Sequence, residues 1–178
     1  MPTSHERSQL SDLVSAARAG SLDALGELYR RHADDVHALA FRITLSRDDA
    51  ADVLQELFVG LPRALRAYTE RGRFESWLKQ VTVRVCLMHM RRQQRKREQP
   101  LDDLPPLVQG AATGDALDRI ALEQALAALP AALRTVFVLK ETEGYTHVEI
   151  GELLEISSAN SATRLSRAWS ILRKELRP

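Results

Sequence analysis

Apolar side chains recur every three or four positions along most of the chain, and no segment shows the sustained alternation that a β-strand requires. The spacing predicts a helix near 9–19 that stops at Gly20, and a second that begins after Ser21 and carries apolar residues as far as Ile43. A third helix follows Ser46, and a fourth covers about 74–97. The sequence therefore predicts an all-α fold.

The third predicted helix has the clearest apolar stripe. Ser46 is suited to cap it, and Asp48 and Asp49 lie in its first turn, where the helix dipole favours negative charge. Pro62 has no N–H to donate back to Phe58, so we expect it to kink or end the helix. The stripe consists of Ala50, Val53, Leu54, Leu57, Phe58 and Leu61. The exposed side offers Asp52, Gln55 and Glu56.

The fourth predicted helix is apolar on two sides, which indicates a central helix of a bundle or one covered by a partner. One side carries Phe74, Trp77, Leu78, Val81, Val85 and Met88, and the other carries Val83, Cys86, Leu87 and Met90. The helix ends in the basic run Arg91-Arg92-Gln93-Gln94-Arg95-Lys96-Arg97. Charge runs usually form solvated faces, so the run alone is a weak signal for nucleic acid.

The composition changes at 98–114, which reads EQPLDDLPPLVQGAATG. Its prolines and glycines make a helix implausible, so we predict a flexible linker there. Fully extended, it could span about 55–60 Å, at roughly 3.3–3.6 Å per residue. The linker would join two small helical domains, 8–97 and 115–178.

In the second domain we predict a helix near 115–129, one from Pro130 to Glu143, and then two helices joined by a short turn. Thr146 and Glu149 have the spacing of a capping box, Gly144 ends the preceding helix, and Ser157 or Ser158 caps the last one. The inner face of the first helix of this pair is Ile150, Leu153 and Leu154.

The last predicted helix separates apolar from polar residues. One side carries Ser161, Leu165, Ala168, Trp169, Leu172 and Leu176. The other carries Asn160, Thr163, Arg167, Ser170 and Lys174, with Arg164 on the flank. Arg and Asn can pair with guanine and adenine through two hydrogen bonds each, so the pattern favours a DNA-binding helix-turn-helix. The alternative is a pair of ordinary bundle helices with a solvated polar face.

Composition and the absence of known motifs mainly exclude other kinds of site and function. The formal net charge of +1 says little about partners, and Cys86, the single cysteine, excludes an internal disulfide. Cys86 and His89 have a C-x-x-H spacing, but no second ligand pair accompanies them, so we predict no metal site and no cofactor. The sequence has no phosphate loop or nucleophile elbow, which argues against an enzyme. No long apolar span or signal peptide appears, so we expect a cytoplasmic protein that does not insert into a membrane.

Several motifs, in order, resemble the extracytoplasmic-function (ECF) group of bacterial sigma factors. The segment from Asp52 to Phe58 is similar to the family's D-L-V-Q-E-V-F, and the segment from Arg73 to Leu78 to its S-F-R-T-W-L. The following R-R is Arg91-Arg92. The second domain matches through Leu129-Pro130, Val136-Phe137-Val138-Leu139, Glu143-Gly144-Tyr145-Thr146, Glu149-Ile150, Ile156-Ser157 and Arg164-Leu165-Ser166-Arg167-Ala168.

The resemblance implies a subunit of RNA polymerase that selects promoters. The N-terminal domain would bind the clamp of the largest polymerase subunit through Asp52, Gln55 and Glu56. It would bind and open minus-10 DNA, with phosphate attraction from Arg84, Arg91, Arg92, Arg95 and Lys96. The C-terminal domain would sit on the flap of the second-largest subunit and bind minus-35 promoter DNA. An anti-sigma factor covering the polymerase-binding surfaces is also implied.

Within the C-terminal domain, Arg167 is the first choice for a base contact, beside Asn160, Thr163 and Ser166. Arg164 and Lys174 are expected to contact phosphates, and His147 has a helix-start position suited to the same role. A surface histidine without a task is the alternative for His147.

The chain also departs from the family pattern, which often has Asn at Arg84 and Asp at Met88, so we interpret Met88 as core. Ala162 replaces a common basic residue, Asn160-Ser161 stand in place of Thr-Val, and Glu155 stands where Gly usually makes the turn.

Two other functions stay open. One is an autonomous helix-turn-helix regulator with an N-terminal dimerisation or sensing bundle. The other is a helical adaptor that has lost DNA binding.

Overall fold

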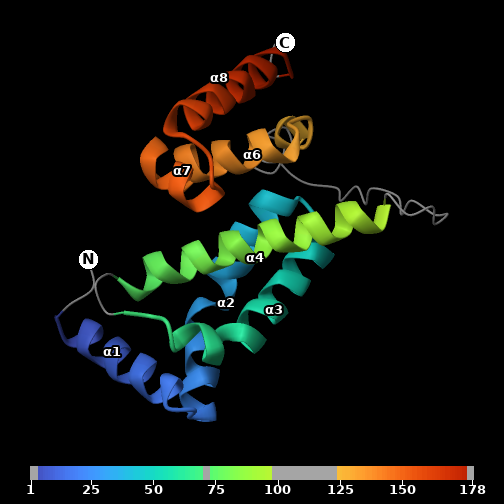
Figure 1. Ribbon diagram of the computed structural model, residues 1–178. Coiled ribbons are helices and arrows are strands. Elements are labelled where there is room, and N and C mark those ends of the chain that lie inside the picture. The colour runs from blue at the N-terminus through green and yellow to red at the C-terminus, as the bar shows by residue number, and fades with distance from the viewer. Residues whose placement is uncertain (1–3, 70–72, 98–123, 176–178) are drawn as a thin grey trace, which may run out of the picture. The chain divides into compact units, whose positions relative to one another are not determined.

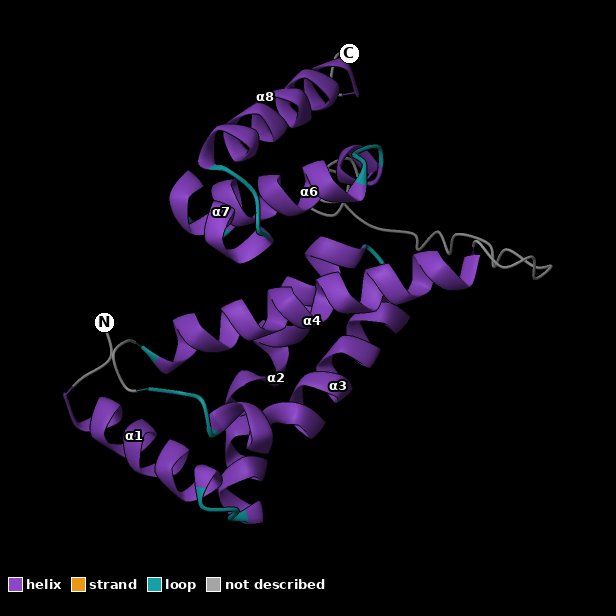
Figure 2. Cartoon of the chain, viewed as in Figure 1, coloured by secondary structure: helices purple, strands orange, loops and turns teal. Residues whose placement is uncertain are grey.

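The computed structural model describes residues 4–69, 73–97 and 124–175, and every element in these ranges is a helix (Figures 1 and 2). The chain divides into an N-terminal unit, Met1–His89, and a C-terminal unit, Met90–Pro178. The division falls within the helix α4, Phe74–Arg97. The all-α prediction is confirmed. The predicted linker, 98–114, lies outside the described residues.

The N-terminal unit is built from α1 (Ser4–Arg18), α2 (Leu22–Thr44), α3 (Arg47–Leu65) and α4. Helix α2 packs along α3, and α1 packs against both. The core is aliphatic where these helices meet, and its largest fully buried members are Leu28, Leu39, Ile43, Val53, Leu57, Leu61, Leu65 and Val83. Apart from Val83, which is on α4, these residues lie at the helical spacing of the α2 and α3 stripes, so each stripe buries one face.

Local sequence sets the helix boundaries in this unit. The Ser21 hydroxyl accepts from the Ala24 N–H at 3.3 Å at the start of α2, and the Ser46 hydroxyl accepts from the Asp49 N–H at 3.1 Å at the start of α3. Both satisfy an N–H that the helix itself leaves unpaired. Gly20 has φ +97° after α1, and Leu45 has φ 56° after α2. The boundary of α4 agrees with the predicted 74–97.

The N-terminal unit differs from the prediction at several positions. The helix α3 continues to Leu65, three residues beyond Pro62, so the proline does not end it. The core interpretation of Met88 is wrong, since its side chain is 48% exposed. The polar residues Thr82 and His89 are buried instead.

An aromatic cluster joins the start of α4 to the rest of the unit. Phe74 contacts Tyr68 at a ring-centroid distance of 5.8 Å and Trp77 at 5.6 Å. The His32 ring of α2 lies 5.4 Å from Phe74. Such pairs add about 0.5–1.5 kcal/mol each beyond area burial. The cluster therefore fixes the N-terminal end of α4 against α2.

The C-terminal unit has shorter elements. Residues 124–127 are helical, and the rest of the helix predicted near 115–129 lies partly outside the described residues. The helix α6 (Ala131–Phe137) continues as the π-helix η1 (Val138–Thr142). Then come α7 (His147–Leu154) and α8 (Ser158–Glu175), and α8 packs against both α6 and α7. Buried Arg134 of α6 donates to the carbonyls of Leu129 and Leu126, at 3.1 and 3.5 Å.

The predicted helix-turn-helix is confirmed in its local details. Thr146 and Glu149 form the capping box: the Thr146 hydroxyl accepts from the Glu149 N–H, and the Glu149 carboxylate accepts from the Thr146 N–H at 2.7 Å. Gly144 has φ +75° and Glu155 has φ 57°, so the turn is left-handed at Glu155 despite its side chain. Ser157 caps α8 by accepting from the Asn160 N–H at 3.1 Å.

Candidate nucleic-acid interface

Three polar side chains of α3 form one exposed face, which we call the acidic α3 surface: Asp52, Gln55 and Glu56. Asp52 and Gln55 are exposed, and Glu56 is half-buried. Their spacing of three and four residues places them side by side on the helix. Val53 and Leu57 on the opposite side are 0% and 2% exposed, so the core fixes which way this surface faces. Exposed Val59, at 82%, extends it by one turn.

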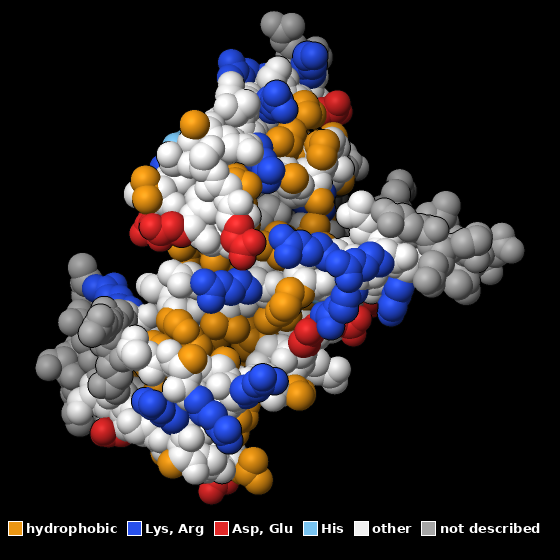
Figure 3. All heavy atoms as spheres, in the orientation of Figure 1, with side chains coloured by type: hydrophobic (Ala, Val, Ile, Leu, Met, Phe, Trp, Pro, Cys, Tyr) orange, Lys and Arg blue, Asp and Glu red, His pale blue; other side chains and the backbone are white. Residues whose placement is uncertain are grey.

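The arginines predicted for minus-10 DNA form a second surface, the basic α4 stripe, made of Arg84, Arg91, Arg92, Arg95 and Lys96. All five are exposed. Lys and Arg side chains gather over the C-terminal half of α4 (Figure 3). Positions 84, 88, 91 and 95 follow the spacing of one helix face, so exposed Met88 lies within the stripe. An apolar side chain among arginines was missed by the sequence pattern, which placed Met88 with the core residues.

A contact between α3 and α4 joins these two surfaces. His89 Nε2 and Asp49 Oδ1 lie 2.8 Å apart, although the residues are 40 positions apart in the chain. His89 is 7% exposed, and 30% of the Asp49 side chain is exposed, so the histidine is shielded from water and the carboxylate is partly open to it. The contact lies one turn from Asp52 on α3 and two residues before Arg91 on α4. The contact was not predicted, because no spacing rule connects residues of two separate helices.

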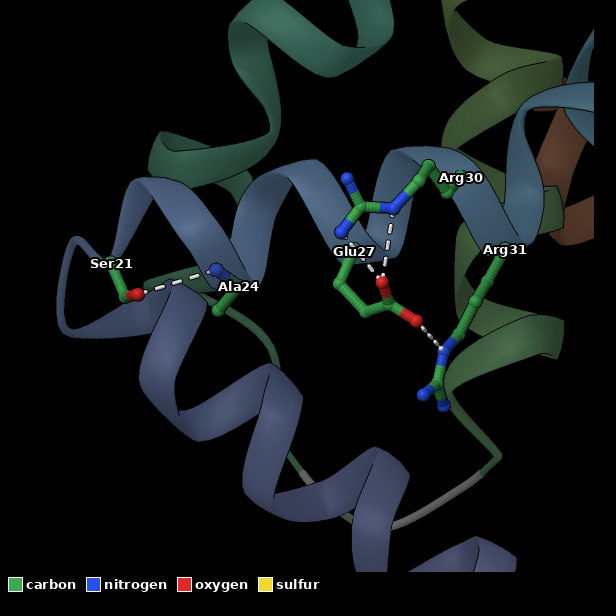
Figure 4. Close-up of polar contacts among 5 residues, drawn as sticks. All are labelled: Ser21, Ala24, Glu27, Arg30 and Arg31. Atoms are coloured by element: carbon green, nitrogen blue, oxygen red, sulfur yellow. Dashed lines mark hydrogen bonds and ion pairs between the residues drawn. The ribbon is translucent and has the colours of Figure 1, made fainter.

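Two other exposed arginines of this unit, Arg30 and Arg31, share one acceptor. Glu27, six residues after the Ser21 cap of α2, accepts from Arg30 Nη2 and from Arg31 Nε, each at 2.7 Å (Figure 4). Hydrogen bonds from Arg31 and then Arg30 lower the pKa of Glu27. One carboxylate therefore accepts hydrogen bonds from two guanidinium groups. This offsets their positive charge locally.

The outer face of α8 carries the residues predicted for minus-35 DNA. Asn160, Thr163, Ser166, Arg167 and Lys174 are exposed, whereas Ser161, Ala168 and Leu172 on the other side are at most 1% exposed. Arg164 is half-buried, and its Nε donates to Asn160 Oδ1 at 3.0 Å. Thr163 Oγ1 donates to the Ala159 carbonyl at 2.9 Å. Trp169, predicted on the inner face, is 36% exposed and packs edge-on against Phe137.

His147 has a structural contact that the sequence did not reveal. Its Nδ1 lies 3.0 Å from the Ser161 hydroxyl, which is fully buried on α8. The bond connects the first residue of α7 to α8. It leaves the histidine half-buried at the helix start, where its second ring nitrogen remains for a phosphate. The predicted phosphate role and this structural role are compatible.

Two shifted pKa values describe the chemistry of the interior. Burial raises the pKa of Cys86 to about 12, so the thiol stays protonated at neutral pH. Because the thiolate is the form that ligates metals, the C-x-x-H pair of Cys86 and His89 is poorly suited to that task. Burial also lowers the pKa of Arg134, which donates to backbone carbonyls.

Comparison with known proteins agrees with this geometry. Residues 28–96 match the family model "Sigma-70 region 2", and residues 119–170 match "Sigma-70, region 4". The ECF RNA polymerase sigma factor SigM of Mycobacterium tuberculosis is 30% identical over 172 residues, which cover 97% of this chain and 86% of SigM. This chain belongs to the ECF sigma factors of the sigma-70 family.

Solved structures show the same fold. The sigma factor RpoE from Bartonella quintana, in complex with the anti-sigma factor NepR, matches with a TM-score of 0.68 at 18% identity, over 85% of this chain and 95% of that one. CnrH, in complex with the cytosolic domain of CnrY, matches with a TM-score of 0.61 at 23% identity, over 92% of this chain and 94% of that one.

As a sigma factor, the chain directs promoter-specific transcription initiation. The alternative of an autonomous regulator is not favoured. Within the described residues, no helix of this sigma factor has the length and apolarity needed to cross a membrane.

Proposed function

We propose that the sigma factor uses its three exposed helix faces on three different partners. The acidic α3 surface binds the clamp of the largest polymerase subunit, the basic α4 stripe binds and opens minus-10 DNA, and the outer face of α8 binds minus-35 DNA. The observation that carries the proposal is that almost all these side chains are exposed while the opposite side of each helix contributes to a core. The domains 8–97 and 115–178, joined by 98–114, would divide these tasks.

Charge supports the assignment of the first two surfaces. Asp52 and Glu56 offer acceptors to a basic protein surface, and complementary charge raises association rates. A matched test compares Asp52→Asn and Gln55→Ala with Asp34→Asn, which removes an exposed acid from α2. We expect capture of the chain by core polymerase to fall for the α3 variants only. Equal capture of all variants would remove this surface from the proposal.

Met88 adds an apolar element to the proposed minus-10 surface. Strand opening requires a base to leave the stack, which costs a few kcal/mol, and apolar side chains are the usual wedges beside an unstacked base. Met88 is 48% exposed within the basic α4 stripe, so it can contact such a base while the arginines hold the backbone. The Met88→Ala variant should bind duplex promoter DNA normally with polymerase but open it more slowly, as permanganate footprinting would show.

In the C-terminal unit, Arg167 and Lys174 provide a comparison between a base contact and a phosphate contact. Arg167→Ala should cost about 1–3 kcal/mol of binding and relax the preference at one base pair. Lys174→Ala should weaken binding to all sequences alike and lower the salt slope by about 1. Competition binding of promoter variants at several salt concentrations, with core polymerase present, measures both. Unchanged promoter output from Arg167→Ala would favour the adaptor hypothesis.

Core polymerase and an anti-sigma factor complete the proposed set of partners, all in the cytoplasm. RpoE and NepR, as well as CnrH and CnrY, were solved as complexes, which supports an equivalent inhibitor for this chain. It would cover the acidic α3 surface and compete with polymerase.

Run-off transcription on a genomic fragment library, with and without the chain, tests the function as a whole. We expect new start sites only when the chain and core polymerase are both present. Tight binding to a two-fold-symmetric site without polymerase would favour the autonomous regulator instead.

A further inference from the structure

The contact between α3 and α4 is part of a larger cluster of potential metal ligands. One ligand atom each from Asp49, Asp52 and His89 lies within 4.8 Å of the other two. Asp49 and Asp52 are three residues apart on α3, so their carboxylates share one side of the helix. His89 reaches them from α4. Three side chains from two helices thus converge on one point.

The imidazole distinguishes this cluster from an ordinary acidic surface. His89 is 7% exposed, Asp49 has 30% of its side chain exposed, and Asp52 is exposed. The site is therefore closed on one side and open to water on the other. His89 Nε2, the nitrogen 2.8 Å from Asp49 Oδ1, is directed toward the carboxylates. A buried imidazole held in place by packing costs little ordering entropy when it binds a ligand.

The donor set fits a particular class of ion. Imidazole suits Zn²⁺, Co²⁺, Ni²⁺ and Fe²⁺, whereas Mg²⁺ and Ca²⁺ prefer all-oxygen sites. Zinc lies about 2.0–2.2 Å from nitrogen and carboxylate oxygen, so two ligands of a tetrahedral ion are roughly 3.4 Å apart. The 2.8 Å His89–Asp49 pair must open slightly, and Asp52 must turn inward. Water would complete the coordination on the exposed side.

We propose that Asp49, Asp52 and His89 form a binding site for a divalent transition-metal ion such as Zn²⁺. The ion takes the place of the proton shared between His89 and Asp49, and Asp52 supplies the third ligand. Binding joins the N-terminal end of α3 to the middle of α4 more rigidly than the hydrogen bond alone. The thiol of Cys86 takes no part, because its high pKa keeps it protonated.

Metal binding would also affect the polymerase, a consequence that rests on the proposed function of Asp52. A carboxylate that ligates the ion is not available to a basic clamp surface, and the two positive charges of the ion neutralise those of the two aspartates. Zn²⁺ should therefore lower the affinity of the chain for core polymerase.

The direct test uses the full chain, stripped of metal, with Co²⁺ as a spectroscopic probe and Zn²⁺ in thermal denaturation. We expect saturable 1:1 binding, visible d–d absorption without a thiolate charge-transfer band, a Tm raised by Zn²⁺, and little response to Mg²⁺. Loss of a second-shell group already weakens metal sites about 10–100-fold, so Asp52→Asn and His89→Gln should each weaken binding by at least about 10-fold.

Two controls make the test specific. Asp48→Asn removes an exposed carboxylate from the same turn of α3 but leaves the cluster complete, so its affinity for Co²⁺ should equal that of the native chain. Circular dichroism of His89→Gln checks that the buried substitution folds. Asp52 is exposed, so Asp52→Asn remains informative even if His89→Gln does not fold. Native affinity in Asp52→Asn, a cobalt–thiolate band, or no saturable binding would each overturn the proposal.

A second experiment separates the metal site from the proposed function. Zn²⁺ should reduce capture of the native chain by core polymerase, whereas Asp49→Asn, which keeps Asp52, should be captured equally with and without Zn²⁺. The Asp49 variant also controls for any effect of Zn²⁺ on the polymerase itself. A native chain that binds Zn²⁺ but is captured equally well would leave the metal site standing and overturn the placement of Asp52 on the polymerase surface.

Discussion

The two units reach a defined structure by different means. In the N-terminal unit α2, α3 and α4 have 23, 19 and 24 residues, and their functional faces depend on contacts between residues far apart in the chain, such as His89 and Asp49. In the C-terminal unit α6 and α7 have only 7 and 8 residues. Short helices are marginal alone, so there the caps and turns matter more.

The difference shows in what holds each surface in place. The outer face of α8 is oriented by neighbours close in sequence: the Thr146–Glu149 capping box, the left-handed Glu155 and the Ser157 cap. The acidic α3 surface is oriented by an aliphatic core and by the aromatic cluster of Phe74, Tyr68 and Trp77. We therefore expect single local substitutions to damage the C-terminal unit more than the N-terminal one.

The chain carries its own reporters for this comparison. Its two tryptophans are Trp77, which packs against Tyr68 and Phe74, and Trp169, which packs against Phe137. One lies in each unit. In a Trp169→Phe background the fluorescence of Trp77 should report the unfolding of the N-terminal unit alone, and in a Trp77→Phe background that of Trp169 should report the C-terminal unit. Circular dichroism checks that each variant keeps its helical content.

The largest contrast is expected between two glycines. A Cβ at Gly151 would lie 2.7 Å from the Ile156 carbonyl oxygen, which is backbone in the turn and cannot move aside easily. Gly151→Ala should cost about 1–3 kcal/mol, as overpacked sites do. A Cβ at Gly60 of α3 meets nothing within 4 Å, so Gly60→Ala should stabilise by about 0.5–1 kcal/mol. Urea unfolding measures both changes, followed at Trp169 for Gly151→Ala and at Trp77 for Gly60→Ala. Equal effects would contradict the expectation that local substitutions damage the C-terminal unit more than the N-terminal one.

The next contrast is between two helix caps. Thr146→Ala removes the hydroxyl half of the capping box at α7, the bond from the Glu149 N–H, and Ser46→Ala removes the bond from the Asp49 N–H at α3. Each substitution should lower the free energy of unfolding of its own unit by about 1 kcal/mol, since caps contribute about 0.5–2 kcal/mol. The fluorescence of the tryptophan in that unit measures the change. Thr146→Ala should also weaken minus-35 binding, because α7 holds α8, whereas Ser46→Ala should leave it unchanged. Loss of DNA binding in both variants would argue against separate roles.

These elements also show what a sequence can predict. The caps at Ser46 and Thr146 and the helix end at Gly144 were predicted because each depends on residues within a few positions, whereas the left-handed turn at Glu155 was indicated only by the family resemblance, in which Gly usually stands there. The bounds of α4 were predicted because a long helix repeats its apolar spacing many times. Local chemistry and periodicity were sufficient for the element order and the helix-turn-helix.

Contacts between distant residues were not predictable in this way. Met88 has the spacing of a core residue, yet no neighbouring helix covers it in the described residues, and only packing decides that. The Asp49–His89 and His147–Ser161 pairs join separate helices, and no spacing rule connects them. Periodicity fixes which side chains share a face, but not which partner each face meets. The residues that make up each candidate surface were therefore predictable, whereas the hydrogen bonds that connect one helix to another were not.

A smaller effect is expected at Glu155 and Leu45, the left-handed residues of the described ranges that are not glycine. Glu155 ends α7 with φ 57° and an exposed side chain, so Glu155→Gly should stabilise the C-terminal unit by up to about 1 kcal/mol. Leu45 ends α2 with φ 56°, but its side chain is half-buried. Leu45→Gly loses apolar contact as it gains backbone freedom, so it should bring less stabilisation or none. Thermal unfolding at the two tryptophans distinguishes these outcomes.

The smallest effect we expect is a pH dependence at His32. Burial lowers its pKa, while Glu75 and Asp35 raise it and Arg31 lowers it. Its Nε2 is buried without a hydrogen-bond partner among the described residues. Because the neutral form is favoured on folding, the unfolded chain takes up the proton first as pH falls. Stability should be constant above about pH 6.5, the ordinary pKa of histidine, and should fall between that pH and the lower folded value.

Unfolding of the N-terminal unit, followed at Trp77 from neutral to mildly acidic pH, measures this effect. His32→Leu removes the titrating group and leaves an apolar side chain against Phe74, so it should flatten the profile without lowering stability at neutral pH. His37→Gln, on the same helix with a half-buried side chain, is the matched control for replacing a histidine of α2. A profile that keeps its slope in His32→Leu would assign the acid sensitivity to other groups. The interior of α2 would then contribute only packing to the difference between the two units.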